Sequence, residues 1–263
     1  MNPERISPLA YIHPSAVLGK DVEVHPFAYI DRDTVIGDGC IIHAYASILP
    51  GATLGRNNHV YQHAVIGATP QSFRWQGGQA THVRIGDDNS IRENVVIAGG
   101  LEEDAATTIG HRNYLMDGVH ICHDVHIGDD AVLGIGSQVA GDCEIQSHAI
   151  LSSGVILQHC ARVGQFSLIQ SGCVVQKDVP PYIILGGTPA SYHGVSATIL
   201  QKFGMQERIL RHISNAYRIV YSGNEALEDA LQKITEQIPG SEEIDNIVDF
   251  IRNSKRGIVR RTE

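Results

Sequence analysis

Residues 109–145 read IGHRNYLMDGVHICHDVHIGDDAVLGIGSQVAGDCEI, and this stretch decides the fold. Every sixth position in it holds a branched aliphatic residue: Ile109, Leu115, Ile121, Ile127, Leu133, Val139 and Ile145. Six residues turn an α-helix by about 600°, so in a helix successive members of this set would point in different directions. The period of six therefore excludes an amphipathic helix and indicates another repeating structure.

The same ladder of aliphatic residues covers most of the chain. It runs from Ile12 to Ile66, resumes over residues 85–97, and continues from Ile109 to Val175 without a miss. A small or narrow side chain stands two positions before most of these residues, and a glycine often follows them. This is the hexapeptide pattern of a parallel β-helix, in which short strands alternate with tight corners. The length of the ladder predicts about eight triangular coils, stacked like the strands of a sheet.

The ladder is interrupted at residues 67–84 and 98–108, which we expect to be loop excursions from the coils. Loops on a rigid scaffold often carry function, so both are candidate parts of a site. The six-residue period ends after DVPPYIILGGTPA at residue 190. Helical spacing of apolar residues then predicts three helices, over 209–221, 227–238 and 241–251, with Ser241 as an N-cap. We predict a mainly β fold with a coil domain over 1–190 and a C-terminal helical domain over 191–263.

The composition indicates the cellular compartment and limits the classes of partner that the chain is expected to bind. The five cysteines form no CxxC pair, and three of them, Cys40, Cys143 and Cys173, stand at the small inward position, where we expect core filling. The odd total of five cysteines argues against a framework of disulfides, so a reducing cytosol is favoured. We find neither the apolar core of a signal peptide at the start nor an apolar stretch long enough for a membrane span. The net charge of −9 argues against a nucleic-acid partner.

Five motifs give the chain a resemblance to a known family: IRENVVI (91–97), HICHDVHIGD (120–129), QKDVPPYIILGG (176–187), SNAYRIVY (214–221) and SKRGIVR (254–260). The chain resembles the acyl-carrier-protein-dependent UDP-N-acetylglucosamine O-acyltransferases, which open lipid A synthesis, over nearly its whole length. The resemblance implies coils wound left-handed and a homotrimer with active sites between neighbouring subunits. It also implies an acyl carrier protein and a nucleotide sugar as partners, and no cofactor.

The resemblance also implies catalytic roles. His123 matches the family's general base, Asp124 its orienting acid, and the backbone N–H of Gly141 its oxyanion donor. An imidazole suits this task because it gains and loses a proton near neutral pH. The implied reaction is direct attack of a sugar hydroxyl on an acyl thioester. His120 is expected to position the substrate, whereas His126 is expected to be a residue of the coil surface.

The positions that match the family's substrate contacts are largely substituted. They are Gln71, Ser72, Arg74, His120, Asp142, Gln158, His159, Ser196 and Lys202. The family has histidine in place of Asp142 and the reverse order of Gln158 and His159. The positions expected to bound the acyl chain are Ser153, Gln170 and Ser171, where bulkier side chains than the family's glycines predict a medium or short chain. These changes predict weaker use of UDP-N-acetylglucosamine than of a different sugar nucleotide.

Three alternatives remain open from the sequence. One is a paralogue that acylates another nucleotide sugar, and another is a catalytically idle trimeric scaffold. The third is a zinc enzyme like the β-helical carbonic anhydrases. The histidines of the HICHDVH segment stand three apart, and two coils upstream of His120 and His123 stand Arg84 and Asp87. Since zinc needs three or four converging ligands, we expect no metal.

Overall fold

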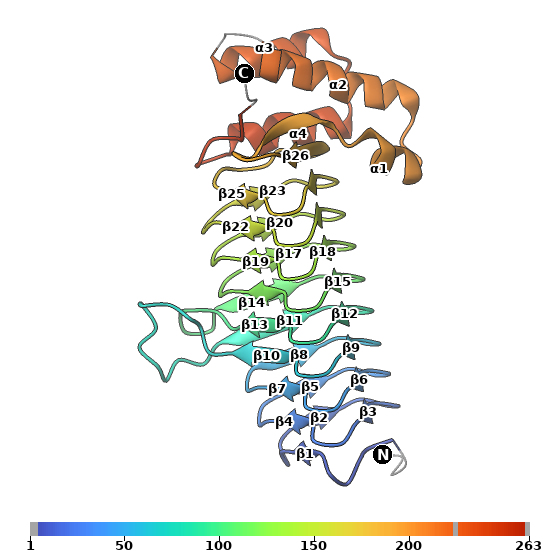
Figure 1. Ribbon diagram of the computed structural model, residues 1–263, viewed down its shortest axis with the longest axis vertical. Coiled ribbons are helices and arrows are strands. Elements are labelled where there is room, and N and C mark those ends of the chain that lie inside the picture. Colours follow the sequence, from blue (N-terminus) through green and yellow to red (C-terminus); the bar gives the residue numbers. More distant parts are fainter. Residues whose placement is uncertain (1–4, 223–225, 261–263) are drawn as a thin grey trace.

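The computed structural model describes residues 5–222 and 226–260, and within these ranges the strands form three sheets that wind around one axis (Figure 1). Sheet I has nine strands: β1 (Tyr11–Ile12), β4 (Tyr29–Ile30), β7 (Ser47–Ile48), β10 (Val65–Ala68), β13 (Val96–Ala98), β16 (His120–Ile121), β19 (Gln138–Val139), β22 (Ile156–Leu157) and β25 (Val174–Val175). Sheet II has eight: β2 (Val17–Leu18), β5 (Val35–Ile36), β8 (Ala52–Leu54), β11 (His82–Ile85), β14 (Ala106–Ile109), β17 (His126–Ile127), β20 (Glu144–Ile145) and β23 (Arg162–Val163). Sheet III has ten: β3 (Glu23–Val24), β6 (Ile41–Ile42), β9 (His59–Val60), β12 (Ser90–Ile91), β15 (Tyr114–Leu115), β18 (Val132–Leu133), β21 (Ile150–Leu151), β24 (Leu168–Ile169), β26 (Ile183–Gly186) and β27 (Ser191–Val195).

From β1 to β25, neighbouring strands in each sheet are three apart in sequence, so three strands make one coil, and β26 and β27 then extend sheet III beyond β24. The aliphatic ladder keeps the coils in register: Ile121 pairs with Ile97 on one side and with Val139 on the other. These side chains are fully buried along the axis, as the period of six predicted. Cys40, Cys143 and Cys173 are buried with them, which confirms their predicted place in the core.

Where sheet II turns into sheet III, three buried asparagines form a ladder that the aliphatic period did not reveal. The Oδ1 of Asn58 accepts the N–H of Asn89 at 3.0 Å, and the Oδ1 of Asn89 accepts the N–H of Asn113 at 2.8 Å. The Oδ1 of Asn113 in turn accepts the N–H of Ala131 at 2.8 Å. Each amide therefore satisfies polar groups of the next coil that water cannot reach.

The middle member of this ladder should be important for stability. In Asn89→Ala the N–H of Asn113 and the carbonyl of Gly110, now bonded at 2.8 Å and 3.0 Å, would lose their partner. Each unsatisfied buried group costs about 1–3 kcal/mol, so we expect the free energy of unfolding to fall by about 2–4 kcal/mol. Urea denaturation at one fixed protein concentration measures this. Asn215→Ala, on an exposed helical position, is the control, and equal losses in the two variants would contradict the role of the ladder.

The C-terminal segment caps the last coil with four helices in the described residues: α1 (Ala197–Lys202), α2 (Glu207–Ser222), α3 (Leu227–Gln237) and α4 (Glu242–Arg252). The three predicted helices correspond to α2, α3 and α4, and Ser241 caps α4 by accepting the N–H of Ile244 at 3.4 Å. The sequence did not reveal α1, because six residues are too few to show a helical period. Strand β27 follows residue 190 and still belongs to sheet III, and the domain division at that residue stays a prediction.

Residues from two of the five motifs named above attach these helices to the coils. Tyr182, from the Pro-Pro-Tyr turn, is buried, and its hydroxyl lies 3.2 Å from the Nδ2 of Asn246 on α4. Ser254, from the SKRGIVR segment, donates from its hydroxyl to Asp178 at 2.7 Å. Among the described helices, none has both the length and the apolar character needed to cross a bilayer.

Candidate active site

Both loop excursions leave the coils at the corner between sheets I and II, here called the I–II corner. The first lies between β10 and β11 and the second between β13 and β14, and they project together from the stack (Figure 1). They are bonded to each other, since the N–H of Ala80 donates to Glu103 at 3.1 Å and the N–H of Asp104 donates to the carbonyl of Ala80 at 2.8 Å. The next coil places His123 at the same corner, directly beyond the excursions.

His123 and Asp124 occupy the turn between β16 and β17. Asp124 has a φ of 58°, in the left-handed region that aspartate tolerates, and its carboxylate turns back toward the histidine. The Nδ1 of His123 lies 2.9 Å from the Oδ2 of Asp124. Because a carboxylate can only accept, Nδ1 carries the proton, and Nε2 is left as the basic nitrogen. The imidazole is 7% exposed, so little water competes for it.

The second excursion supplies a residue that the sequence did not suggest. The backbone N–H of Leu101 donates to the Oδ2 of Asp124 at 3.1 Å. The Leu101 side chain is buried, which anchors this part of the loop against the coils. The only signal of this role in the sequence was that Leu101 is the one large aliphatic residue in the stretch 98–108. The carboxylate of Asp124 is therefore held from two sides, and the imidazole that it contacts is held with it.

Gly141 lies one coil beyond His123 and is packed against its ring. A Cβ at this position would stand 2.5 Å from the Cε1 and 2.7 Å from the Nε2 of His123. Only glycine leaves room for the imidazole. Among the hydrogen bonds of the described residues, none uses the N–H of Gly141, so this donor is available to a ligand beside the basic nitrogen.

A cavity of about 480 Å³ is lined by Asp124 and Asp142, which directly follow His123 and Gly141 in the sequence. Its lining includes Arg74 from the first excursion, Leu101 and Glu102 from the second, and Asp124, His126 and Asp142 from the coils. A larger cavity of about 910 Å³ lies between sheet II and α4, but its lining includes neither Asp124 nor any residue of the two excursions. We therefore take the smaller cavity, whose lining includes Asp124 and residues of both excursions, as part of the site.

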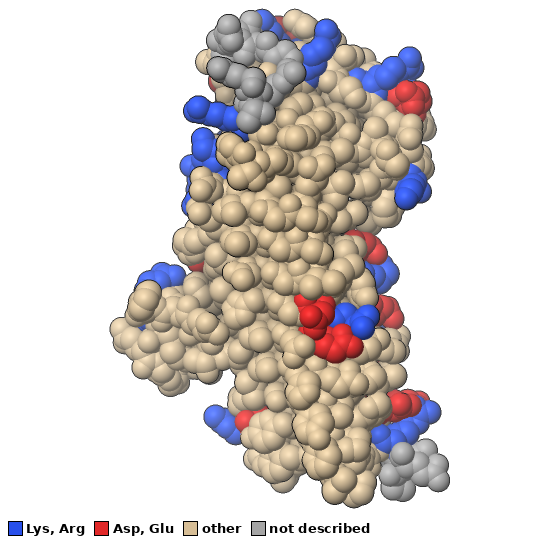
Figure 2. Space-filling view, viewed as in Figure 1, with Lys and Arg blue, Asp and Glu red and all other residues tan. Residues whose placement is uncertain are grey.

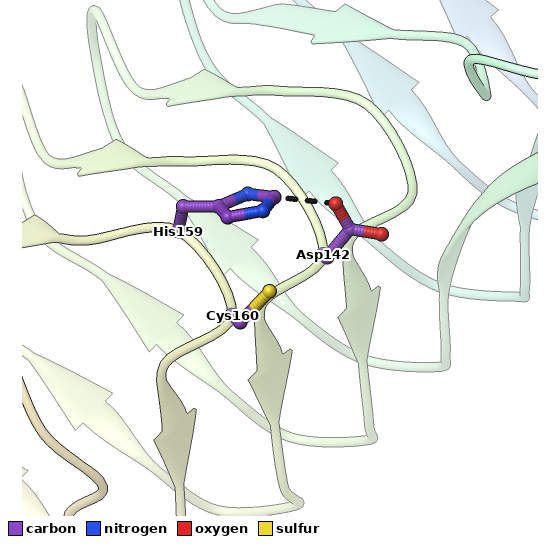
Figure 3. Close-up of side chains that lie close together, drawn as sticks. All are labelled: Asp142, His159 and Cys160. Carbon is purple, nitrogen blue, oxygen red and sulfur yellow. Dashed lines mark ion pairs between the residues drawn. The ribbon is translucent and has the colours of Figure 1, made fainter. Parts of the chain in front are cut away.

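Other predicted substrate contacts follow along the same corner. His120 lies on β16 and is half-buried, and this burial lowers its pKa from the ordinary value. Asp142 and His159 are exposed on the two coils after His123, and the His159 Nδ1 lies 3.4 Å from the Asp142 Oδ2 (Figure 3). Gln158 is exposed beside them.

The first excursion contributes three more of the predicted contacts. Gln71 and Arg74 are exposed, and Ser72 is half-buried and accepts the N–H of Arg74 at 3.3 Å. The I–II corner thus gathers residues from three separate parts of the chain.

Comparison with known proteins decides the family. The model for UDP-N-acetylglucosamine O-acyltransferase, domain 2, matches residues 178–259, and the bacterial transferase hexapeptide model matches residues 33–68. The acyl-[acyl-carrier-protein]–UDP-N-acetylglucosamine O-acyltransferase of Halorhodospira halophila is 37% identical over 257 residues, which cover 97% of this chain and 99% of that protein. The chain belongs to the UDP-N-acetylglucosamine O-acyltransferase family. The same enzyme of Myxococcus xanthus is 36% identical over 260 residues, covering 97% of this chain and 99% of that protein.

Solved structures of this acyltransferase family confirm the fold class. The UDP-N-acetylglucosamine acyltransferase of Bacteroides fragilis 9343 superposes with a TM-score of 0.94 at 46% identity, covering 97% of this chain and 99% of that one. The corresponding protein of Acinetobacter baumannii superposes with a TM-score of 0.94 at 30% identity, covering 97% of this chain and all of that one. The left-handed parallel β-helix with C-terminal helices, predicted from the hexads and the motifs, is thereby confirmed.

Some residues expected from the acyltransferase resemblance lie away from the I–II corner. Ser153, Gln170 and Ser171 are exposed at the corner where sheet III turns into sheet I, here called the III–I corner. Sheet I separates the two corners within one chain. Lys202 is exposed at the end of α1.

One residue predicted to contact the sugar is buried in the structure. Ser196 is only 2% exposed, and its hydroxyl lies 2.8 Å from the carbonyl oxygen of Phe166 and 2.9 Å from that of Tyr182. The hydroxyl is thus committed within the chain, at the start of α1. A short polar residue before a helix is as typical of a structural turn as of a ligand contact, and the sugar contact of Ser196 stays a prediction.

Proposed function

We propose that this chain transfers an acyl group from an acyl-carrier-protein thioester to a hydroxyl of UDP-N-acetylglucosamine, the type of reaction that begins lipid A synthesis. The observation that carries the proposal is the His123–Asp124 pair, whose ring packs against Gly141, a residue whose N–H has no partner among the described residues. This is the pairing of a general base with an oxyanion donor that acyl transfer requires. Relatives and solved structures that cover nearly the whole chain carry the name of this activity.

The reaction follows from this geometry. The Nε2 of His123 takes the proton of the sugar hydroxyl as its oxygen attacks the thioester carbonyl. Asp124 stabilises the resulting imidazolium through Nδ1, while the N–H of Gly141 donates to the oxygen that becomes negative. When the carbon–sulfur bond breaks, the imidazolium returns the proton to the leaving thiol. No cofactor is needed, because each step moves only the one proton and the acyl group.

An acyl-transfer assay tests the activity and the acceptor together. Carrier-protein thioesters of several chain lengths would be offered with UDP-N-acetylglucosamine and with its 3-amino analogue. A kcat/KM of about 10⁴ M⁻¹s⁻¹ or more with UDP-N-acetylglucosamine supports the proposal. A clear preference for the analogue would instead support a different sugar nucleotide as acceptor, as the substituted positions predicted. Turnover with neither acceptor would favour the idle scaffold.

We further propose a homotrimer whose active sites lie between subunits. The support is geometric, because His123 and the predicted acyl-chain residues stand at different corners of one chain. The III–I corner of a neighbour beside the I–II corner of this chain would bring them together. Phe73, fully exposed on the projecting first excursion, is available for such a contact. A mass in solution of about three times the 28.6 kDa chain would support this assembly.

Mixed assemblies test whether the site is shared. One chain would carry His123→Ala and the other Gln170→Trp, which we expect to obstruct the acyl path. Random mixing of the two inactive chains leaves about a quarter of interfaces with neither lesion, so about a quarter of wild-type activity should return. No recovery in trimers of proven mixed composition would place the whole site within one chain.

The acyl carrier protein should dock on a basic surface of the helical domain, defined by Lys202, Arg208 and Arg211. All three side chains are exposed, and Lys and Arg surround the helical end of the molecule (Figure 2). Changing both arginines to glutamate should raise the KM for the carrier thioester about tenfold and weaken its dependence on salt. Lys20→Glu, on an exposed position at the opposite end, is the matched control. A thioester of free pantetheine should be used equally by all variants, and an unchanged carrier KM would place docking elsewhere.

The acyl groove should accept medium or short chains. The Gln170 side chain reaches across to Gly186, where a Cβ would meet its Oε1. If the acyl chain passes this corner, Gln170 and Ser171 shorten its path, and a 10-carbon thioester should turn over faster than a 14-carbon one. Gln170→Gly should shift the ratio of the two rates toward the longer chain. Faster turnover of the 14-carbon thioester by the unaltered protein would contradict this proposal.

We also propose a cytosolic location. All five cysteines are free thiols, as is usual in a reducing compartment.

A further inference from the structure

Three metal-ligating side chains converge on successive coils of the I–II corner. Asp142 and Cys160 occupy equivalent turn positions one coil apart, with φ values of 58° and 60°, and His159 immediately precedes the cysteine. Each offers one donor atom, and the three atoms all lie within 4.8 Å of one another (Figure 3). Asp142 and His159 are exposed and Cys160 is half-buried, so an ion could reach all three donors.

We propose that Asp142, His159 and Cys160 bind one divalent transition-metal ion of the zinc type. A carboxylate, an imidazole and a thiolate are the ligands that zinc takes in proteins. The 3.4 Å between the His159 Nδ1 and the Asp142 Oδ2 also suits this ion. In a tetrahedron with metal–ligand bonds of about 2.1 Å, two donors stand about 3.4 Å apart. Small side-chain movements would bring the sulfur to the same distance.

The surroundings set the character of this site. Burial, followed by the Asp142 carboxylate, raises the pKa of the Cys160 thiol, so an ion must displace a proton to bind. Arg74 and Arg256 act on this thiol in the opposite direction, which weakens the attraction for a cation. Three protein ligands leave a fourth coordination position, which water or an anionic oxygen could take.

The trio shares no residue with His123, Asp124 and Gly141, which carry the proposed acyl transfer. The assignment also differs from the carbonic anhydrase alternative, because it uses none of the histidines of the HICHDVH segment. The sequence prediction of no metal rested on that segment and on Arg84 and Asp87 two coils upstream of it.

Metal binding can be measured without any substrate. Chelator-treated full-length protein would be titrated with Co²⁺, whose bond to a thiolate gives a charge-transfer absorption band, and then with Zn²⁺ as competitor. We expect one ion per chain and a band that Zn²⁺ abolishes. Cys160→Ser should remove the band, and Asp142→Ala and His159→Ala should each weaken affinity by at least about tenfold. Cys122→Ser, which changes a half-buried thiol outside the trio, is the control and should bind like the unaltered protein. Absence of the band, or equal affinity in Cys160→Ser, would overturn the site.

A consequence rests on the proposed function, since Asp142 and His159 are also proposed sugar contacts. Bound Zn²⁺ would occupy both side chains and should inhibit acyl transfer. The ratio of rates with and without Zn²⁺ should be well below one in the unaltered protein and near one in Cys160→Ser. Equal inhibition of both would show that the ion acts elsewhere. A protein that binds Co²⁺ but transfers no acyl group would refute the proposed function and leave the metal site standing.

Discussion

Replacing His123 by alanine should lower turnover by about 10²–10⁴-fold while leaving the fold intact. The expectation follows from the ring's place: its Nδ1 is held by Asp124 at 2.9 Å, and its Nε2 is the basic atom beside Gly141. Alanine removes the only base at this position, and water cannot readily replace it where the ring is 7% exposed. Steady-state rates with saturating thioester and acceptor measure the loss. Circular dichroism and the mass in solution show whether the fold and assembly persist.

His13→Ala is the matched control for this variant. His13 stands at the I–II corner of the first coil, does not line the cavity of the site, and its Nδ1 contacts the hydroxyl of Ser15 at 2.9 Å. We expect its removal to leave turnover near the wild-type rate. A folded His123→Ala protein with unchanged turnover would exclude His123 as the base. Equal losses in both variants would indicate a general disturbance of this corner.

Gly141→Ala should lower turnover by about 10²-fold, although it keeps the backbone N–H. The added Cβ would stand 2.5 Å from the Cε1 of His123, so the imidazole must leave its place against Asp124. A displacement of about 1 Å in a catalytic group can have an effect of this size. The backbone itself tolerates a side chain at this turn position, since His123 and His159 occupy it on the neighbouring coils. The kcat should fall more than the KM rises.

A double-mutant cycle separates this clash from any other effect of the methyl group. Gly141→Ala should destabilise the unaltered protein by about 1–3 kcal/mol, the usual range for an overpacked site. In the His123→Ala background the contacted ring is gone, and the same change should cost much less. Urea denaturation of the four proteins gives the coupling. Equal costs in both backgrounds would mean that the alanine strains something other than the imidazole.

The aliphatic ladder determined the coils by itself. A period of six is a local property, and each hexad buries its one inward side chain against the equivalent hexad of the neighbouring coil, as Ile121 does against Ile97. The same local rule placed Cys40, Cys143 and Cys173 in the core. Helical spacing likewise identified α2, α3 and α4. The HICHDVH segment already contained the adjacent histidine and aspartate, and the family resemblance proposed their roles.

The tertiary structure alone decided which side chains meet between coils. The ladder sets the direction of inward residues but leaves the corner residues undetermined, because their contacts depend on which coil lies above and below. The packing of Gly141 against the His123 ring arises in this way, as does the bond from Leu101 to Asp124. Burial of Ser196 is another such outcome, because the chain continues from β27 into α1 there. The convergence of Asp142 with His159 and Cys160 has the same physical origin, since a carboxylate and an imidazole far apart in sequence become neighbours only when two coils stack.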